Sequence, residues 1–208
     1  MIAVIDYGMG NLGSVAKAIE KVGGRPVVTS HAADLKVAGK IVLPGVGAFG
    51  DAAKNLAEKG LRDAVIEAIH AGKPFLGICL GLQLLQEASE ESPGCPPGLG
   101  LIPGTVKRFP NADASGRRIK VPHIGWNQVY PGKAANPVSR GVAPGTYFYF
   151  VHSYYVLPQD ESLVALWCGY GDVRFAAMVA WGNVYATQFH PEKSQSEGLA
   201  LLRRFVEL

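Results

Sequence analysis

The sequence predicts an α/β fold: an open, mostly parallel sheet flanked by helices, with additional antiparallel strands in the C-terminal half. Two observations predict it. Before residue 93, short apolar strands alternate with amphipathic helical segments, which is typical of a parallel sheet covered by helices on both faces. After residue 93, short strands are separated by Pro and Gly, which is typical of antiparallel pairing. Because 48% of the 208 residues are hydrophobic, one domain over residues 1–208 is expected.

The predicted elements alternate along the N-terminal half. Strands are expected at residues 2–5, 26–29, 40–43 and 75–78, and helices at residues 14–22, 52–71 and 80–88. A closing helix at residues 196–208 carries Leu199, Leu202 and Phe205 on one face. Ligands of such sheets bind beyond the carboxyl ends of the strands. A site is therefore expected in the turns that follow residues 43 and 78.

The composition indicates a cytoplasmic enzyme. The net charge of +3 is spread along the chain, so no nucleic-acid partner is indicated. Cys79, Cys95 and Cys168 form no C-x-x-C pair, so neither a disulfide framework nor a metal site is indicated, and no cofactor is expected. The N-terminus lacks a signal-peptide pattern, and no apolar run has the length of a membrane span, so no membrane partner is expected.

Cys79 falls on the predicted turn between a strand and a helix. A turn this sharp strains its central residue and crowds its neighbours, so positions without side chains are needed two residues to either side. Gly77 and Gly81 supply them. A helix N-terminus favours thiolate over thiol, and the N–H of Leu80 points to where an oxyanion would form. The alternative is an inert thiol in an apolar core, so a nucleophile also requires a base.

His190 is the candidate base, at the end of a predicted strand. Pro191 keeps it extended, so that His190 and Glu192 project on the same side and the carboxylate can hold one ring nitrogen. This is the arrangement of nucleophile, base and orienting group used in acyl transfer. The alternative is a solvated polar turn. The rival base, His152, has no acidic residue two positions away, and its aromatic neighbours suit a satisfied core histidine.

These motifs resemble the triad-type class I glutamine amidotransferases, in which cysteine, histidine and glutamate hydrolyse the side-chain amide of glutamine. The resemblance implies a flavodoxin-like sheet and a catalytic set of Cys79, His190 and Glu192. It also implies an oxyanion loop after the strand at residues 40–43, where the two glycines around Val46 let a peptide plane reorient. The implied site residues are Leu80, Val46 and Gly47 for the oxyanion, and Gln83, Ser153 and Tyr154 for the substrate L-glutamine.

The variant of each motif is similar to the glutaminase subunits of imidazole glycerol phosphate synthases. The segments are those at residues 6–11, 44–47, 122–127, 152–154 and 190–194. This resemblance implies a heterodimer with a (β/α)-barrel cyclase subunit, which receives the ammonia for histidine biosynthesis, and an interface that includes Asn11, Trp126 and Lys193. The alternatives are the glutaminase subunit of pyridoxal phosphate synthase, a cysteine peptidase or deglycase on a related fold, and a catalytically silent binding module.

The loop at residues 8–13 also matches the dinucleotide-binding pattern of three glycines between a strand and a helix. Its next strand ends in Thr29 and Ser30 rather than in the acidic residue that binds a ribose hydroxyl, and Asp34 comes too late. Nucleotide binding is therefore not expected. In the resembled family this loop is a segment that faces the partner beside the active site.

Overall fold

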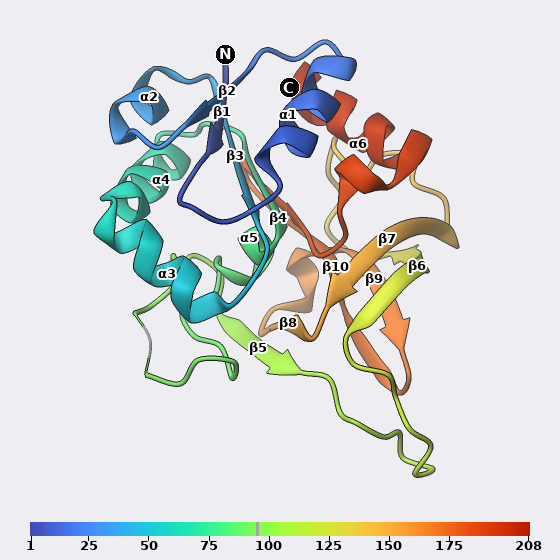
Figure 1. The fold of residues 1–208 in the computed structure, drawn as a ribbon. Coiled ribbons are helices and arrows are strands. Elements are labelled where there is room, and N and C mark those ends of the chain that lie inside the picture. Colours follow the sequence, from blue (N-terminus) through green and yellow to red (C-terminus); the bar gives the residue numbers. More distant parts are fainter. Residues whose placement is uncertain (95) are drawn as a thin grey trace.

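A computed structural model describes residues 1–94 and 96–208, so Cys95 lies outside the described residues. Within them the main sheet has nine strands, in the order β2-β1-β3-β4-β11-β10-β9-β6-β7 (Figure 1). The parallel part consists of β1 (Ile2–Ile5), β2 (Pro26–Thr29), β3 (Lys40–Gly45), β4 (Phe75–Cys79) and β11 (Val184–Thr187).

Antiparallel strands extend this sheet from β11. They are β6 (His123–Pro131), β7 (Thr146–His152), β9 (Val164–Tyr170) and β10 (Val173–Trp181). A separate two-stranded sheet pairs β5 (Gly104–Arg108) with β8 (Tyr154–Pro158). The predicted fold class is therefore confirmed, including the change from parallel to antiparallel strands in the C-terminal half.

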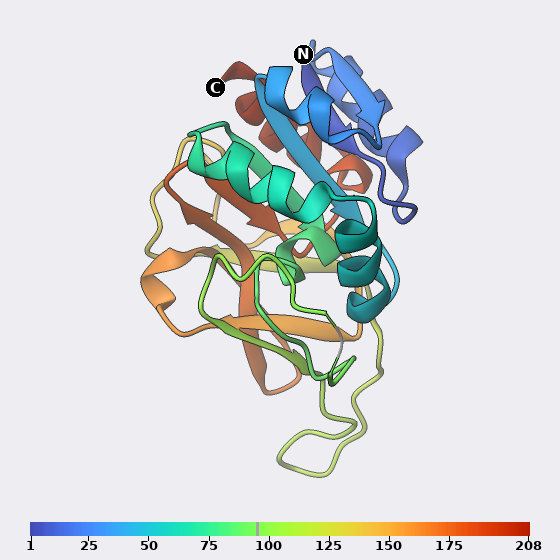
Figure 2. The ribbon, with the colours of Figure 1, turned by 90° about the vertical axis from the view of Figure 1, so that its left-hand side faces the viewer.

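Helices cover both faces of the sheet (Figures 1 and 2). They are α1 (Leu12–Lys21), α2 (Ala32–Val37), α3 (Phe49–Glu58), α4 (Leu61–His70), α5 (Leu80–Gln83) and α6 (Gln195–Glu207), with 3-10 turns η1 (Glu161–Leu163) and η2 (Pro191–Lys193). Successive residues of a strand point to opposite faces. In β1, Ile5 accordingly joins a core with α2, α3 and α4, whereas Val4 joins a core with α1 and α6.

The closing helix packs as predicted. Leu202 and Phe205 are fully buried, and the partly buried Leu199 packs against the same core. No helix in the described parts of the chain is both long and apolar enough to cross a membrane.

Two predicted helices are wrong in extent. The single helix at residues 52–71 is in fact α3 and α4, because Gly60 takes a left-handed conformation (φ 64°) between them. The helix at residues 80–88 stops at Gln83. The carbonyl groups of Leu84 and Leu85 instead accept hydrogen bonds from the backbone at Leu99 and Leu101, which return from the following loop.

Candidate active site

Cys79 is the last residue of β4 and directly precedes α5. Its dihedral angles, φ 56° and ψ −103°, are strained for a residue with a side chain, at a cost of about 1–3 kcal/mol. A Cβ on Gly77 would lie 2.7 Å from the carbonyl oxygen of Gly81, and a Cβ on Gly81 would collide with the carbonyl of Leu43. The predicted turn and its two glycines are therefore confirmed. The helix after it has only four residues, so the dipole argument for thiolate is weaker than the sequence indicated.

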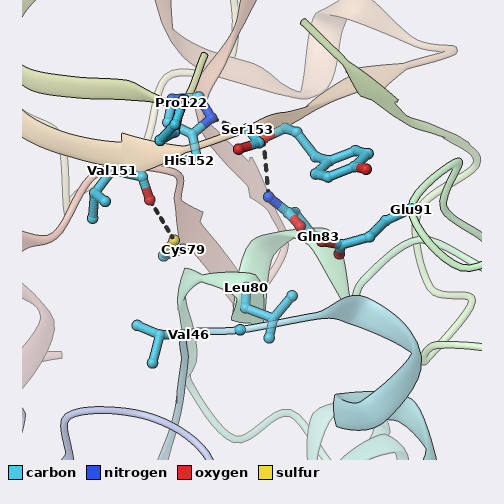
Figure 3. A pocket seen from close by; sticks show the side chains of 11 residues that line it. Val46, Cys79, Leu80, Gln83, Glu91, Pro122, Val151, His152 and Ser153 are labelled. Carbon is cyan, nitrogen blue, oxygen red and sulfur yellow. Dashed lines mark hydrogen bonds between the residues drawn. The ribbon is translucent and has the colours of Figure 1, made fainter.

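The thiol of Cys79 has two polar neighbours besides the predicted site residues. Nε2 of Gln188 donates a hydrogen bond to Sγ at 3.6 Å. Sγ also lies 3.9 Å from the carbonyl oxygen of Val151 (Figure 3). Neither residue was singled out from the sequence. Gln188 could have been found, since it precedes His190 by two positions at the end of β11.

His190 and Glu192 form a buried pair, as their spacing predicted. Nδ1 of His190 lies 2.8 Å from Oε1 of Glu192, and both side chains are nearly inaccessible. Burial alone would lower the pKa of His190, but its contact with Cys79 and then with Glu192 raises that pKa to about 10. Nε2 of His190 has no hydrogen-bond partner within residues 1–94 and 96–208. The ring therefore carries a proton at neutral pH, and its second nitrogen is available.

A cavity of about 330 Å³ opens in front of Cys79 (Figure 3). Its lining brings together the predicted residues Val46, Gly47, Cys79, Leu80, Gln83, Ser153 and Tyr154, together with Glu91, Pro122, Val151 and His152. His190 and Glu192 are not among the residues that line this cavity, and His190 lies beside Cys79, which does. Glu91 was missed in the sequence because it lies in an irregular loop. Its carboxylate accepts a hydrogen bond from the backbone N–H of Phe49 at 2.8 Å.

Gln83 is almost fully buried, and its amide nitrogen is already engaged. Nε2 donates to the carbonyl oxygen of Tyr154 at 3.0 Å and to Oε1 of Gln188 at 3.3 Å. Gln83 therefore joins α5 to the start of β8 and to the residue that contacts Cys79. It is part of the cavity wall.

His152, the rival base in the sequence analysis, is a buried core histidine with satisfied ring nitrogens. Burial is the main cause that lowers its pKa to about 3. Nδ1 lies 2.8 Å from the carbonyl oxygen of Tyr154, to which it donates. The ring is thus neutral at physiological pH, in contrast to that of His190.

The predicted oxyanion loop at residues 44–47 overlaps the end of β3, which runs to Gly45 instead of residue 43, and it is covered by residues 7–10. Gly47 has a positive φ of 103°, and a Cβ added there would lie 2.6 Å from Cε of Met9. A Cβ on Gly45 would collide with the hydroxyl of Tyr7. That hydroxyl is buried, and no described residue gives it a hydrogen bond. Glycines are therefore required where the loop passes under this segment.

The three predicted interface residues have different surroundings. Trp126 is 45% exposed and packs edge-on against Tyr149, with ring centroids 6.1 Å apart. Nζ of Lys193 lies 5.9 Å from the centroid of the same Tyr149 ring. Asn11 is exposed, and its side chain caps α1 by accepting from the N–H of Ser14. Trp126 and Lys193 therefore share one surface, whereas Asn11 lies on the loop before α1.

Comparisons with known proteins agree on one family. The family model described as glutamine amidotransferase class-I matches residues 3–208. Among curated proteins, the imidazole glycerol phosphate synthase subunit HisH of Geobacter sulfurreducens is 51% identical, covering 100% of this chain and 98% of that protein. The subunit of the same name from Syntrophotalea carbinolica is 51% identical, with both chains covered in full.

Solved structures support the fold. PurLQS from Thermotoga maritima superposes with a TM-score of 0.76 at 19% identity, over 99% of this chain and 97% of that one. A structure described as a glutamine amidotransferase gives a TM-score of 0.71 at 20% identity, over 100% and 98% of the two chains.

Proposed function

The chain belongs to the class I glutamine amidotransferases, in the family of imidazole glycerol phosphate synthase subunits HisH, and from this premise we propose that Cys79, His190 and Glu192 are its catalytic triad. Its activity is the hydrolysis of glutamine to glutamate and ammonia for histidine biosynthesis. One observation carries the assignment of the triad. Cys79 lines the cavity in a strained turn, beside a histidine whose other nitrogen is held by a buried carboxylate.

In the first step the thiolate of Cys79, whose proton is held by His190, attacks the side-chain amide carbon of glutamine. A C–S bond forms, and the carbonyl electron pair moves onto oxygen. The N–H of Leu80 and an N–H of the loop at Val46 and Gly47 are proposed to bind that oxyanion, each contributing about 3 kcal/mol. The positive φ of Gly47 supports this role, since a glycine there lets the peptide plane reorient.

His190 supplies the proton for the leaving group. With a pKa of about 10 the imidazolium is the resting form at neutral pH, so Nε2 can protonate the amide nitrogen as the C–N bond breaks. Ammonia leaves, and a γ-glutamyl thioester remains on Cys79. The now neutral ring takes a proton from water, which attacks the thioester and releases glutamate. Glu192 holds Nδ1 throughout and stabilises the positive charge on the ring.

The cavity suits a small amino acid with two charged groups. Glu91 is the one acidic side chain in its lining, which supports it as the group that binds the α-ammonium of glutamine. Ser153 and Tyr154 lie at the junction of β7 and β8 and offer main-chain groups to the substrate. Gln83 is proposed to position these main-chain groups, since its amide nitrogen donates a hydrogen bond to the carbonyl oxygen of Tyr154.

The chain is proposed to work as one domain, in the cytoplasm, in a heterodimer with a (β/α)-barrel cyclase subunit that uses the ammonia. The name shared by the relatives, subunit of a synthase, supports a partner. The exposed Trp126 and Lys193, which flank Tyr149, and the loop at Asn11 are proposed to contact it. The identities of about 50% favour this partner over the pyridoxal phosphate synthase alternative.

Labelling of the thiols tests the assignment of the nucleophile. A glutamine analogue with an electrophilic carbon in place of the amide is expected to modify Cys79 and to leave Cys168 untouched, because burial raises the pKa of Cys168 to about 12. Peptide mass spectrometry of the complex with the cyclase measures this. Cys168→Ala is the matched control and should retain glutamine hydrolysis, whereas Cys79→Ala should lose it and still support synthesis from ammonium salts. Equal labelling of both thiols would contradict the proposal.

A further inference from the structure

Two buried histidines, His123 and His152, face each other across β6 and β7 and take no part in the reaction above. They are direct partners in the register of the two strands. Nδ1 of His123 lies 3.0 Å from Nε2 of His152. The two side chains are therefore joined through one hydrogen bond beneath the cavity that His152 lines.

The partners of these rings fix the direction of each hydrogen bond. Nδ1 of His152 lies 2.8 Å from the carbonyl oxygen of Tyr154, which can only accept, so this nitrogen carries hydrogen. Nε2 of a neutral His152 must then accept from Nδ1–H of His123. Nε2 of His123 in turn accepts from the side-chain amide of Asn127 at 3.1 Å. Both rings are thus neutral, with hydrogen on Nδ1.

The orientation of the Asn127 amide is set by the backbone. Its nitrogen also donates to the carbonyl oxygen of Gly169 at 2.9 Å, and its oxygen accepts from the N–H of Gln128 at 2.8 Å. Each hydrogen bond of this series is therefore donated in the same direction, from Asn127 to His123, from His123 to His152 and from His152 to Tyr154. An additional proton on either ring would place two donors face to face at one of these contacts.

The surroundings of the two rings agree with a neutral pair. His123 stacks on Tyr170 and Phe150, and His152 packs edge-on against Phe109 and Phe175. Burial lowers the pKa of His123 to about 4, and it is the main cause that lowers the pKa of His152 to about 3. The hydrogen bond to Tyr154 raises the pKa of His152, and the proximity of His123 and His190 lowers it. No carboxylate among the described residues pairs with either ring.

The hydrogen-bond chain ends at the carbonyl oxygen of Tyr154, a residue that lines the cavity. The carbonyl oxygen of Tyr154 accepts from both His152 and Gln83, so its position is fixed from two directions. We propose that Asn127 and His123 are positioning residues for glutamine binding, which hold the main chain at Ser153 and Tyr154 through His152. This inference rests on the proposed function for its substrate, but the state of the rings is independent of it.

Nuclear magnetic resonance of the intact chain labelled with ¹⁵N-histidine tests the hydrogen-bond chain without any activity. Two rings are expected as neutral Nδ1–H tautomers that do not titrate between about pH 5.5 and 8.5. His123→Phe should remove one of these signals and shift the other. An Nε2–H tautomer for His152, or titration of either ring near pH 6.5, would overturn the proposal.

Kinetics of the complex with the cyclase tests the positioning role. His123→Phe keeps an aromatic ring against Tyr170 and removes both hydrogen bonds, so the KM for glutamine should rise about tenfold while kcat changes by less than about threefold. His123→Asn keeps a donor near the position of Nδ1 and should restore KM to within about twofold of wild type. The matched control is Tyr130→Phe, which breaks a hydrogen bond to Gln128 on the same strand and should leave KM unchanged.

Two kinetic outcomes would contradict the role. One is that His123→Phe and His123→Asn behave alike, and the other is that kcat falls while KM stays constant. A wild-type complex that hydrolyses no glutamine would instead contradict the proposed function, and the tautomers would still report on the hydrogen-bond chain.

Discussion

His190 and His152 are both buried near Cys79, yet the structure shifts their pKa values in opposite directions. That of His190 is raised to about 10, and that of His152 is lowered to about 3. Burial acts on both in the same sense. The difference lies in their partners, because His190 faces a thiol and a carboxylate whereas His152 faces a carbonyl oxygen and a second neutral ring.

The comparison shows how one site can contain two histidines with different roles: one donates a proton, and the other stays neutral in one tautomer. A charged partner that is itself buried outweighs desolvation, so the ring of His190 keeps its proton and can deliver it. A hydrogen-bond chain closed by neutral groups does the opposite and holds His152 in one tautomer. The role of each histidine is therefore set by the two or three groups that its ring contacts rather than by how deeply the side chain is buried.

The largest expected effect comes from removing the charge beside His190. Glu192→Gln retains the shape of the side chain but cannot stabilise the imidazolium, so kcat for glutamine hydrolysis should fall by about a hundredfold or more. The variant should fold, since Gln at this position can still accept a hydrogen bond from Nδ1. Steady-state kinetics with the cyclase and saturating glutamine measures it.

Two variants make that result specific. Glu197→Gln is the same substitution on the exposed side of α6 and should leave kcat unchanged. His152→Ala should lower kcat less than Glu192→Gln does, because a neutral ring held to Tyr154 has no proton to give. If His152→Ala proved the more damaging change, the two histidines would have been assigned in the wrong order.

A smaller effect, up to about 1.4 kcal/mol per pH unit, is expected in the pH dependence of stability. An unfolded histidine has a pKa of about 6.5. The stabilisation from His190 is therefore complete below about pH 6.5 and is lost as pH rises towards 10. His152 and His123 act in the other direction, because the unfolded chain binds protons below about pH 6.5 that the folded chain refuses until pH 3 to 4.

Separate variants should weaken the pH dependence of the free energy of unfolding on its alkaline side and on its acid side. Urea unfolding at several pH values is expected to show a weaker alkaline loss for Glu192→Gln and a weaker acid loss for His152→Phe, each relative to wild type. A Glu192→Gln variant that changed only the acid side would show that His190 is neutral in the folded protein.

Features with a local cause could be predicted from the sequence. The turn at Cys79 was predictable because Gly77 and Gly81 relieve contacts within a few residues, and the pairing of His190 with Glu192 followed from the two-residue period of an extended chain. Strand positions before residue 93 followed from apolar runs bounded by turn residues. Their order in the sheet was not predicted.

Features with a non-local cause could not be predicted. The end of α5 depends on Leu99 and Leu101 returning to bond the carbonyls of Leu84 and Leu85. The contact between His123 and His152 depends on the register of β6 and β7, which no short pattern specifies. Glu91 was missed for the same reason, since it reaches the site from an irregular loop.

The smallest expected effect contrasts a satisfied hydroxyl with an unsatisfied one. The hydroxyl of Tyr7 is buried against Gly45 at the end of β3 with no hydrogen-bond partner in the described chain, whereas that of Tyr170 donates to the carbonyl oxygen of Lys120 at 2.6 Å. An unpaired buried hydroxyl costs free energy on folding, and a paired one contributes about 1 kcal/mol. Tyr7→Phe should therefore raise the free energy of unfolding by about 1 kcal/mol, and Tyr170→Phe should lower it by about 1 kcal/mol. Urea unfolding at pH 7 measures both, with the slope of the transition as a check that the unfolded states are comparable. Loss of stability in Tyr7→Phe similar to that in Tyr170→Phe would show that the Tyr7 hydroxyl has a hydrogen-bond partner in the folded protein.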